Sequence, residues 1–234
     1  MKTLDVLLAG RVPYRAALAW QRALAEERIA GRRGDLLLLL EHDPVVTLGR
    51  TSDSGNLLQT EGLDVVEVER GGDVTYHGPG QLVGYPILDL SRYRQDLHWY
   101  LRTLEDALIA ALARLNIAAG REPGRTGVWT GGRKIASIGV HVKRWVTWHG
   151  FALNVTTDLK AFDRIVPCGI PGVVMTSIER EGGRGTGDES LQRNGGRGTG
   201  DESLWMRTVD AVVAGFEEAF QVRAQRVLAE AIPA

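Results

Sequence analysis

The chain has 234 residues and a nearly balanced charge, with 28 lysines and arginines against 29 aspartates and glutamates. This balance argues against nucleic acid as a partner, because nucleic-acid-binding proteins carry a basic excess. The densest apolar run, residues 36–40, is far shorter than the roughly 20 residues of a transmembrane helix, and the N-terminal segment is too short and interrupted for a secretory signal. The only cysteine, Cys168, excludes an internal disulfide and fits a reducing compartment. We therefore predict a cytoplasmic protein that binds neither nucleic acid nor membrane.

Hydrophobic periodicity predicts helices and strands along the whole chain, and we expect a single domain over residues 1–234. Apolar residues recur every three or four positions over 14–28 and 97–115, the pattern of helices with one buried face. Asp96 is placed to cap the second helix and Ser203 to cap a third. Continuous or alternating apolar runs predict strands at 4–9, 35–41, 45–48, 63–69, 82–90, 126–130, 134–143, 146–155 and 173–179, with an edge strand from Val222.

A glycine-dense loop separates two of these strands, and the predicted site is organised around it. Residues 70–81 read Arg-Gly-Gly-Asp-Val-Thr-Tyr-His-Gly-Pro-Gly-Gln. Glycine has no Cβ, so such a loop lets the backbone approach a ligand closely and present N–H groups to an anion or a carbonyl oxygen. A structural turn is the alternative, since Gly-Pro-Gly by itself marks a turn. The length of the loop, with its arginine and histidine, favours a binding site that segments 132–139 and 166–170 complete.

Cys168 and Lys134 are the candidate reactive side chains. A lone cysteine is more often a buried apolar filler, but Cys168 lies between Pro167 and Gly169, where a thiol can reach the rim of a pocket. A thiol reacts as the thiolate, which a nearby positive group or base favours. Most lysines are solvated, yet Lys134 leads directly into an apolar strand whose small residues would let a ligand lie against the sheet.

The histidines are further candidates for proton transfer. His42, His77 and His149 each neighbour a turn or a glycine and could share this role, whereas His98 and His141 are expected at the surface. No His-x-x-x-His pair and no second cysteine occurs in the sequence, so we predict no metal site.

A direct repeat interrupts the C-terminal part of the chain. Residues 182–191 recur identically at 195–204. The repeated residues are mostly glycine and polar, with little to bury, which predicts a surface insertion at 182–204. The Gly-Arg-Gly-Thr-Gly pattern lacks the Lys-Ser/Thr of a phosphate-binding P-loop, so we expect no chemistry from it.

Five motifs, in this order, resemble those of the lipoyl(octanoyl) transferases. They are Glu-His-x-Pro-Val-Val-Thr-Leu-Gly-Arg at 41–50, the glycine-dense loop at 70–81, Gly-Arg-Lys-Ile-Ala-Ser-Ile-Gly at 132–139, His-Gly-Phe-Ala-Leu-Asn-Val at 149–155 and Val-Pro-Cys-Gly-Ile at 166–170. The resemblance implies an α+β fold, a mixed bent β-sheet flanked by helices, like the catalytic domain of biotin and lipoate protein ligases. The repeat at 182–204 departs from the family pattern.

The resemblance also implies the reaction. An octanoyl group would pass from octanoyl-acyl carrier protein to a lysine of a lipoyl domain, in 2-oxoacid dehydrogenase complexes or the glycine-cleavage H protein, as the first step of endogenous lipoate synthesis. No cofactor is implied, because the donor thioester is already activated. Cys168 would accept the acyl group, Lys134 would activate it, and backbone N–H groups near Cys168 and in the glycine loop would stabilise the oxyanion. The implied substrate-binding residues are Arg70, Gly71, Gly72, Asp73, Val74, Thr75, Tyr76 and His77 in the loop, and Ser137, Ile138, Gly139, Gly150, Phe151 and Ala152 in the acyl slot.

Three other functions remain open at this point. An ATP-dependent lipoate or biotin ligase would share the fold and the lysine, but it forms an acyl-adenylate and needs no catalytic cysteine. A non-catalytic module that binds a carrier protein would not need both Cys168 and Lys134. A cysteine amidase or protease would need a histidine–acid pair, which the sequence spacing does not identify.

Deleting residues 182–194, one copy of the repeat with its spacer, should leave octanoyl transfer near the wild-type rate, because the segment is polar and holds no predicted site residue. The rate of acyl transfer by the purified deletion variant measures this. A loss of transfer in a variant that still folds would show that the repeat takes part in binding.

Overall fold

The computed structural model describes residues 1–182 and 199–228. These residues form, in chain order, β1 (Lys2–Arg11), α1 (Tyr14–Ile29), β2 (Asp35–Glu41), β3 (Val45–Leu48), β4 (Asp64–Glu67), β5 (Thr75–His77), β6 (Gln81–Ile87), α2 (Leu97–Arg114), β7 (Gly120–Glu122), β8 (Arg125–Thr130), β9 (Arg133–Lys143), β10 (Val146–Asn154), α3 (Thr199–Phe220) and β11 (Val222–Val227). Short 3₁₀ turns at Leu159–Arg164 and Pro167–Gly169 precede the segment that leads to Gly182.

Eight of the strands form one mixed sheet, in the order β11-β1-β2-β6-β10-β9-β8-β7. β1 pairs in parallel with both β2 and β11, and the other neighbours in this sheet are antiparallel. A smaller sheet, β4-β3-β5, lies beside it. The predicted hairpin of β9 and β10 and the predicted edge strand from Val222 are confirmed.

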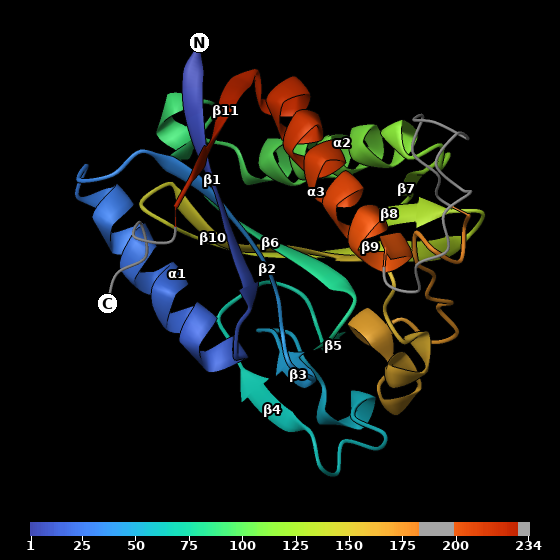
Figure 1. Ribbon diagram of the computed structural model, residues 1–234. Helices are drawn as coiled ribbons and strands as arrows, with labels where there is room; N and C mark the ends of the chain where they lie inside the picture. The colour runs from blue at the N-terminus through green and yellow to red at the C-terminus, as the bar shows by residue number, and fades with distance from the viewer. Residues whose placement is uncertain (183–198, 229–234) are drawn as a thin grey trace.

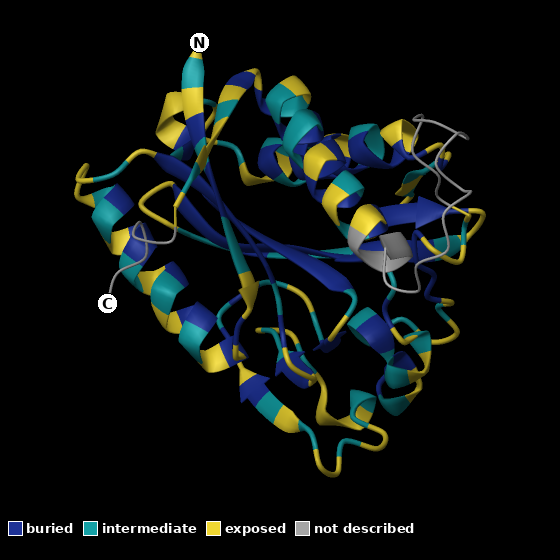
Figure 2. Ribbon diagram, viewed as in Figure 1, coloured by how far each residue is buried: buried dark blue, intermediate teal, exposed yellow. Residues whose placement is uncertain are grey.

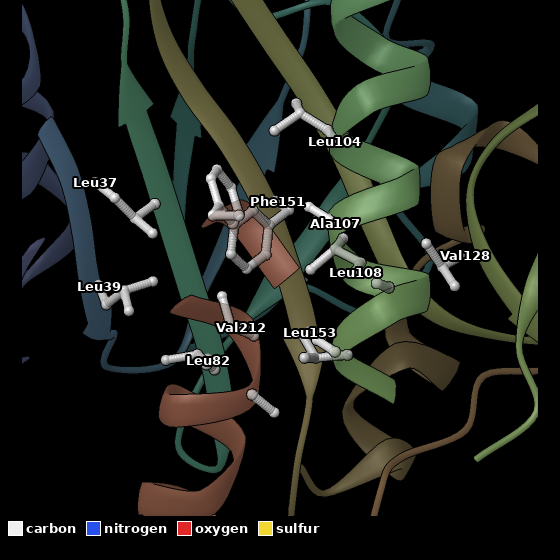
Figure 3. Close-up of a cluster of buried hydrophobic side chains, with 14 of the residues drawn as sticks. Leu37, Leu39, Leu82, Leu104, Ala107, Leu108, Val128, Phe151, Leu153 and Val212 are labelled. Atoms are coloured by element: carbon white, nitrogen blue, oxygen red, sulfur yellow. The ribbon is translucent and has the colours of Figure 1, made fainter. Parts of the chain in front are cut away.

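Helices cover both faces of the large sheet, with α1 on one face and the packed pair α2 and α3 on the other (Figure 1). The alternation of side chains along each strand supplies both cores. On β2, Leu37 and Leu39 pack toward α2 and α3, whereas the neighbouring leucines pack toward α1. Figure 2 shows the central strands buried, and Figure 3 shows Leu37 and Leu39 in the same cluster as Leu104 of α2 and Val212 of α3. The helix-and-sheet layering predicted from the sequence is therefore confirmed, as is the Asp96 cap, whose carboxylate accepts the Trp99 N–H.

The predicted strand at residues 173–179 does not form, although its apolar pattern is that of a strand. Only Met175 forms a bridge, with Lys134, and the hydrogen bonds of the segment go to the ends of two different strands. Lys134 N donates to Val174 O and Thr176 N to Lys134 O, on β9, and Ile178 N donates to Asn154 O, on β10. A segment that crosses strand ends cannot form a continuous ladder. It instead holds the first residues of β9 in place.

Four further predictions need correction. The helix α3 begins at Thr199, so Ser203 lies inside it and does not cap it. The last residues of the second repeat copy are helical, and Leu204 is buried in the core, so the repeat is not entirely a surface loop; residues 183–198 lie outside the described part of the chain. The predicted strand at 63–69 is shorter, and the glycine-dense loop contains the three-residue strand β5. Within the described ranges, no helix is both long and apolar enough to cross a bilayer.

Candidate active site

A cavity of about 290 Å³ lies between the glycine-dense loop and one face of the large sheet. Its floor comes from three adjacent strands, β9, β10 and β6, at residues that share a face because they alternate along each strand. The cross-strand pairs are Ser137 with Ala152, Gly139 with Gly150, and Ala152 with Val83. The floor residues are Ser137, Gly139, Gly150, Ala152, Val83 and Tyr85. Small side chains on β9 and β10 therefore leave open space between the sheet and the loop.

Cys168 lies at the edge of this cavity in a strained turn. Its backbone is left-handed, with φ 59° and ψ 20°, a conformation that costs on the order of 1 kcal/mol or more for a residue with a side chain. The Cys168 N–H donates to Val74 O at 2.9 Å and holds the turn against the glycine-dense loop. Such strain is concentrated at functional sites, where it orients a reactive group.

Lys134 is the basic group that contacts the Cys168 thiol. Its side chain is only 1% exposed, and Nζ donates to Cys168 Sγ at 3.1 Å and to the Thr126 carbonyl oxygen at 3.1 Å. Nζ also lies 5.3 Å from the centre of the Trp129 ring, within range of a cation–π interaction. Among the described residues, Lys134 forms no ion pair with a carboxylate. Its charge is therefore available to stabilise the Cys168 thiolate.

Arg70 organises the loop that forms the roof of the cavity. It is buried, and its guanidinium donates to the carbonyl oxygens of Gly71, Asp73 and Thr47 and to Thr47 Oγ1, at 2.8–3.1 Å. Burial lowers the pKa of Arg70 from its ordinary value. The loop crosses β9 closely, because a Cβ at Gly139 would come within 2.9 Å of the Gly71 carbonyl oxygen. Glycine at this position is thus needed to seat the loop on the sheet.

Asp73 joins this loop to the turn that carries Cys168. Its carboxylate accepts Asn56 Nδ2 at 2.8 Å and the Val74 N–H at 2.6 Å. A Cβ at Gly169 would come within 2.3 Å of Asp73 Oδ2. The Pro-Cys-Gly sequence therefore lets the Cys168 turn approach the carboxylate.

Not every predicted loop residue reaches the cavity. Arg70, Gly72, Asp73, Thr75 and His77 line it, together with the predicted Ser137, Ile138, Gly139, Gly150, Phe151 and Ala152. Gly71, Val74 and Tyr76 are not among the residues that line it. Val74 and Tyr76 alternate with Thr75 and His77, so they face a separate apolar cluster with Phe162 and Met175.

The cavity also has a polar, aromatic end that the sequence analysis largely missed. Tyr14 of α1 and Tyr85 of β6 line it with His77 and His149. Alternation of Tyr85 with Val83 on one strand is the signal that could have placed it there. Gly124, Arg125, Thr126 and Ile170 also line the cavity.

The histidines do not contact the thiol. His42 lies 2.7 Å from Val12 O and 2.6 Å from Tyr85 Oη, and His77 Nδ1 lies 2.8 Å from Gln81 Oε1. Burial lowers the pKa of His42 to about 4, and it also lowers the pKa values of His77 and His149. Within the described part of the chain, Lys134 is the basic side chain at hydrogen-bond distance from Cys168.

The two histidines predicted at the surface differ. His98 is exposed, as predicted. His141 is half-buried, with Nδ1 3.0 Å from Glu69 O and its ring 4.2 Å from the Trp148 ring, so that prediction is wrong. In residues 1–182 and 199–228, no three His, Cys, Asp or Glu side chains gather into a group that could hold a metal ion.

Known proteins resemble this chain in sequence. Residues 13–193 match the lipoyl protein ligase A/B catalytic domain. The chain is 62% identical to an octanoyltransferase of Gloeobacter violaceus over 172 residues, which cover 73% of this chain and 78% of the relative. It is 55% identical to an octanoyltransferase of Geobacter sulfurreducens over 184 residues, which cover 79% of this chain and 77% of that relative.

Solved structures show the same fold at low sequence identity. Lipoate-protein ligase A bound with ATP superposes with a TM-score of 0.73 at 16% identity, over 97% of this chain and 89% of the ligase. A bipartite lipoate protein ligase of Thermoplasma acidophilum gives 0.68 at 16% identity, over 97% and 88% of the two chains. These likenesses confirm the predicted fold, whereas the family rests on the sequence relatives. The chain belongs to the octanoyltransferase family, as its five motifs predicted.

Proposed function

We propose that this enzyme transfers an octanoyl group from octanoyl-acyl carrier protein to a lysine of a lipoyl domain, through a thioester on Cys168. The observation that carries the proposal is the 3.1 Å contact between the buried Lys134 ammonium and Cys168 Sγ at the edge of the cavity. The acceptors would be the lipoyl domains of 2-oxoacid dehydrogenase complexes and the glycine-cleavage H protein, in the cytoplasm. The names of the relatives support octanoyl as the transferred group. The sequence motifs support acyl carrier protein as the donor and a lipoyl domain as the acceptor.

In the first step, the Cys168 thiolate attacks the carbonyl carbon of the donor thioester. The new carbon–sulfur bond forms as the bond to the carrier's sulfur breaks, and the carrier leaves as a thiol after it takes a proton from the Lys134 ammonium, which becomes a neutral amine. In the second step, the acceptor lysine, as the neutral amine, attacks the octanoyl-Cys168 thioester. The neutral Lys134 amine takes the proton that the acceptor amine loses as the amide forms. Cys168 leaves as a thiolate, and the regenerated Lys134 ammonium stabilises it.

The small residues of the floor define the acyl slot. Ser137 Oγ lies 3.9 Å from Cys168 Sγ, and the slot continues across β10 to Val83 on β6. The backbone N–H groups of the cysteine turn are not free to bind an oxyanion, because Cys168 N donates to Val74 O and Gly169 N donates to Val166 O. This corrects the expectation for the cysteine turn and leaves the Lys134 ammonium and the roof loop as the groups that could stabilise the oxyanion.

An ATP-dependent ligase is the alternative that shares the fold. A ligase activates a free acid as an adenylate, so it has no use for a lysine-activated thiol at the cavity. Transfer from octanoyl-acyl carrier protein without ATP would support the thioester route, whereas a requirement for ATP and free octanoate would favour the ligase.

Incubation with octanoyl-acyl carrier protein should add one octanoyl group to the wild-type protein, measured by intact-mass spectrometry. The adduct should be removed by hydroxylamine, because a thioester is labile to it, and by addition of a lipoyl domain. Cys168→Ala should gain no mass and should transfer nothing. An adduct that persists in Cys168→Ala would move the nucleophile to another residue and overturn the proposal.

A further inference from the structure

A buried carboxylate lies on the far side of the peptide group that holds the proposed catalytic lysine. Glu105, on α2, is 0% exposed. Its Oε2 accepts Arg102 Nη1 at 2.7 Å and Arg121 Nε at 2.7 Å. Its other oxygen, Oε1, accepts the Gly127 N–H at 3.1 Å. The two arginines therefore fix the carboxylate so that one oxygen faces β8.

One peptide group connects Glu105 with Lys134. The N–H that Glu105 accepts belongs to Gly127, and the carbonyl oxygen that Lys134 Nζ contacts belongs to Thr126. These are the two ends of the same Thr126–Gly127 peptide unit. A hydrogen bond from the N–H to an anion polarises the peptide and makes its carbonyl oxygen a stronger acceptor, because successive hydrogen bonds reinforce one another in a low dielectric. Glu105 thus stabilises the Lys134 ammonium through the polarised peptide group, although the two side chains are not in contact.

Gly127 makes this arrangement possible. Its φ of 129° is one that side-chain-bearing residues rarely adopt. A Cβ there would come within 2.6 Å of Ala136 O and 2.8 Å of Lys134 Cε. The lysine side chain therefore lies directly against the backbone of β8, with its ammonium on the Thr126 carbonyl oxygen.

We infer that Glu105 is a positioning residue for acyl transfer: through the Thr126–Gly127 peptide it holds the Lys134 ammonium in place and favours its charged form beside Cys168. The inference rests on the proposed role of Lys134. A purely structural role for Glu105, joining α2 to β8, would need the same contacts but would leave the ionisation of the lysine–thiol pair unchanged.

Other charged groups lie near Lys134 and near Glu105. Arg70 and Asp73 from the roof loop and Arg125 from β8 line the cavity with Lys134 and Cys168. On the α2 side, Arg121 also binds Asp106, whose carboxylate accepts Nη2 at 2.6 Å and is largely exposed. Asp106 carries the same charge as Glu105, is its neighbour in sequence and shares its arginine, but it makes no contact with the peptide. It is therefore a matched control.

The test compares Glu105→Gln with Asp106→Asn. Because Cys168 is the only cysteine, the rate of iodoacetamide alkylation against pH reports its thiolate. Glu105→Gln should move the midpoint of that profile upward by about 0.5 to 1 pH unit, the scale expected when one neighbouring charge is removed, and should lower kcat for transfer while KM for octanoyl-acyl carrier protein is retained. Asp106→Asn should leave both unchanged. In a Lys134→Met background, Glu105→Gln should cause no further shift.

A second measurement does not require a Glu105 variant. The amide proton of Gly127 should move upfield in the NMR spectrum of Lys134→Met, because the peptide loses the ammonium that polarises it from the carbonyl side. An unchanged Gly127 resonance, or an unchanged alkylation profile in a folded Glu105→Gln protein, would overturn the relay while leaving the thioester route intact. If Lys134→Met itself leaves the alkylation profile unchanged, the proposed role of Lys134 fails instead.

Discussion

Replacing Lys134 with methionine should lower the rate of octanoyl transfer by roughly 10²- to 10⁴-fold, the range for loss of a positioned acid–base group. Methionine fills the same buried space but carries no charge and no proton, so the thiol loses the ammonium that lies 3.1 Å away. The pH midpoint of Cys168 alkylation should rise, since a nearby cation favours the thiolate. Single-turnover transfer to a lipoyl domain and alkylation kinetics measure the two effects.

The arginine variant separates charge from proton transfer. Lys134→Arg keeps a cation near Cys168 but cannot exchange a proton near neutral pH, so we expect much of the alkylation profile to be preserved while transfer to the amine is lost. Lys143→Met is the matched control, because Lys143 is an exposed lysine at the other end of β9 that pairs with Glu26. An unchanged alkylation profile in Lys134→Met, with a shifted one in His77→Ala or His149→Ala, would transfer the role to that histidine.

Replacing Ala152 with leucine should lower octanoyl transfer by about 100-fold, on the scale by which a few methylenes are discriminated in an apolar pocket. Ala152 lies in the middle of the slot floor, between Ser137 on β9 and Val83 on β6. A leucine there would occupy space needed by the distal carbons of the acyl chain. Competition between octanoyl- and butyryl-acyl carrier protein, followed by intact mass, measures the change in preference.

The shorter chain is the internal control for the leucine variant. Butyryl transfer should be close to wild type, because a four-carbon chain ends before the blocked part of the slot. Equal losses for both chains, in a variant whose melting temperature is close to that of the wild type, would mean that the acyl chain does not lie along this floor.

Local patterns of the sequence predicted most elements of the fold. The leucines of β2, the periodic face of α2 and the alternation of β9 each depend on neighbours a few positions apart, and all three elements form. Residues 173–179 have an equally apolar pattern, yet they do not form a strand because their partners are the ends of β9 and β10. Sequence periodicity indicates which residues are buried, but it does not indicate the hydrogen-bond partners of their backbone groups.

The sequence motifs likewise indicated some features of the site but not others. The motifs pointed to Cys168 and Lys134 as a pair, and the two side chains are in contact although they are 34 positions apart. Within the glycine-dense loop, the motif did not distinguish Thr75 and His77, which face the cavity, from Val74 and Tyr76, which face away. Glu105 could not be predicted at all, because an acidic residue on an amphipathic helix is ordinarily solvated and its contact with Gly127 depends on how α2 packs on β8.

The pairing of β1 with β11 has a consequence for synthesis of the protein on the ribosome. Asp5 and Gln225 bond to each other across 220 positions of sequence. At a translation rate of about 5–20 residues per second, roughly 10 s or more pass between the synthesis of β1 and that of β11. Over that time its outer edge offers unpaired N–H and C=O groups to other chains. Nascent chains stalled before Val222 should therefore depend on chaperones more than the completed protein does.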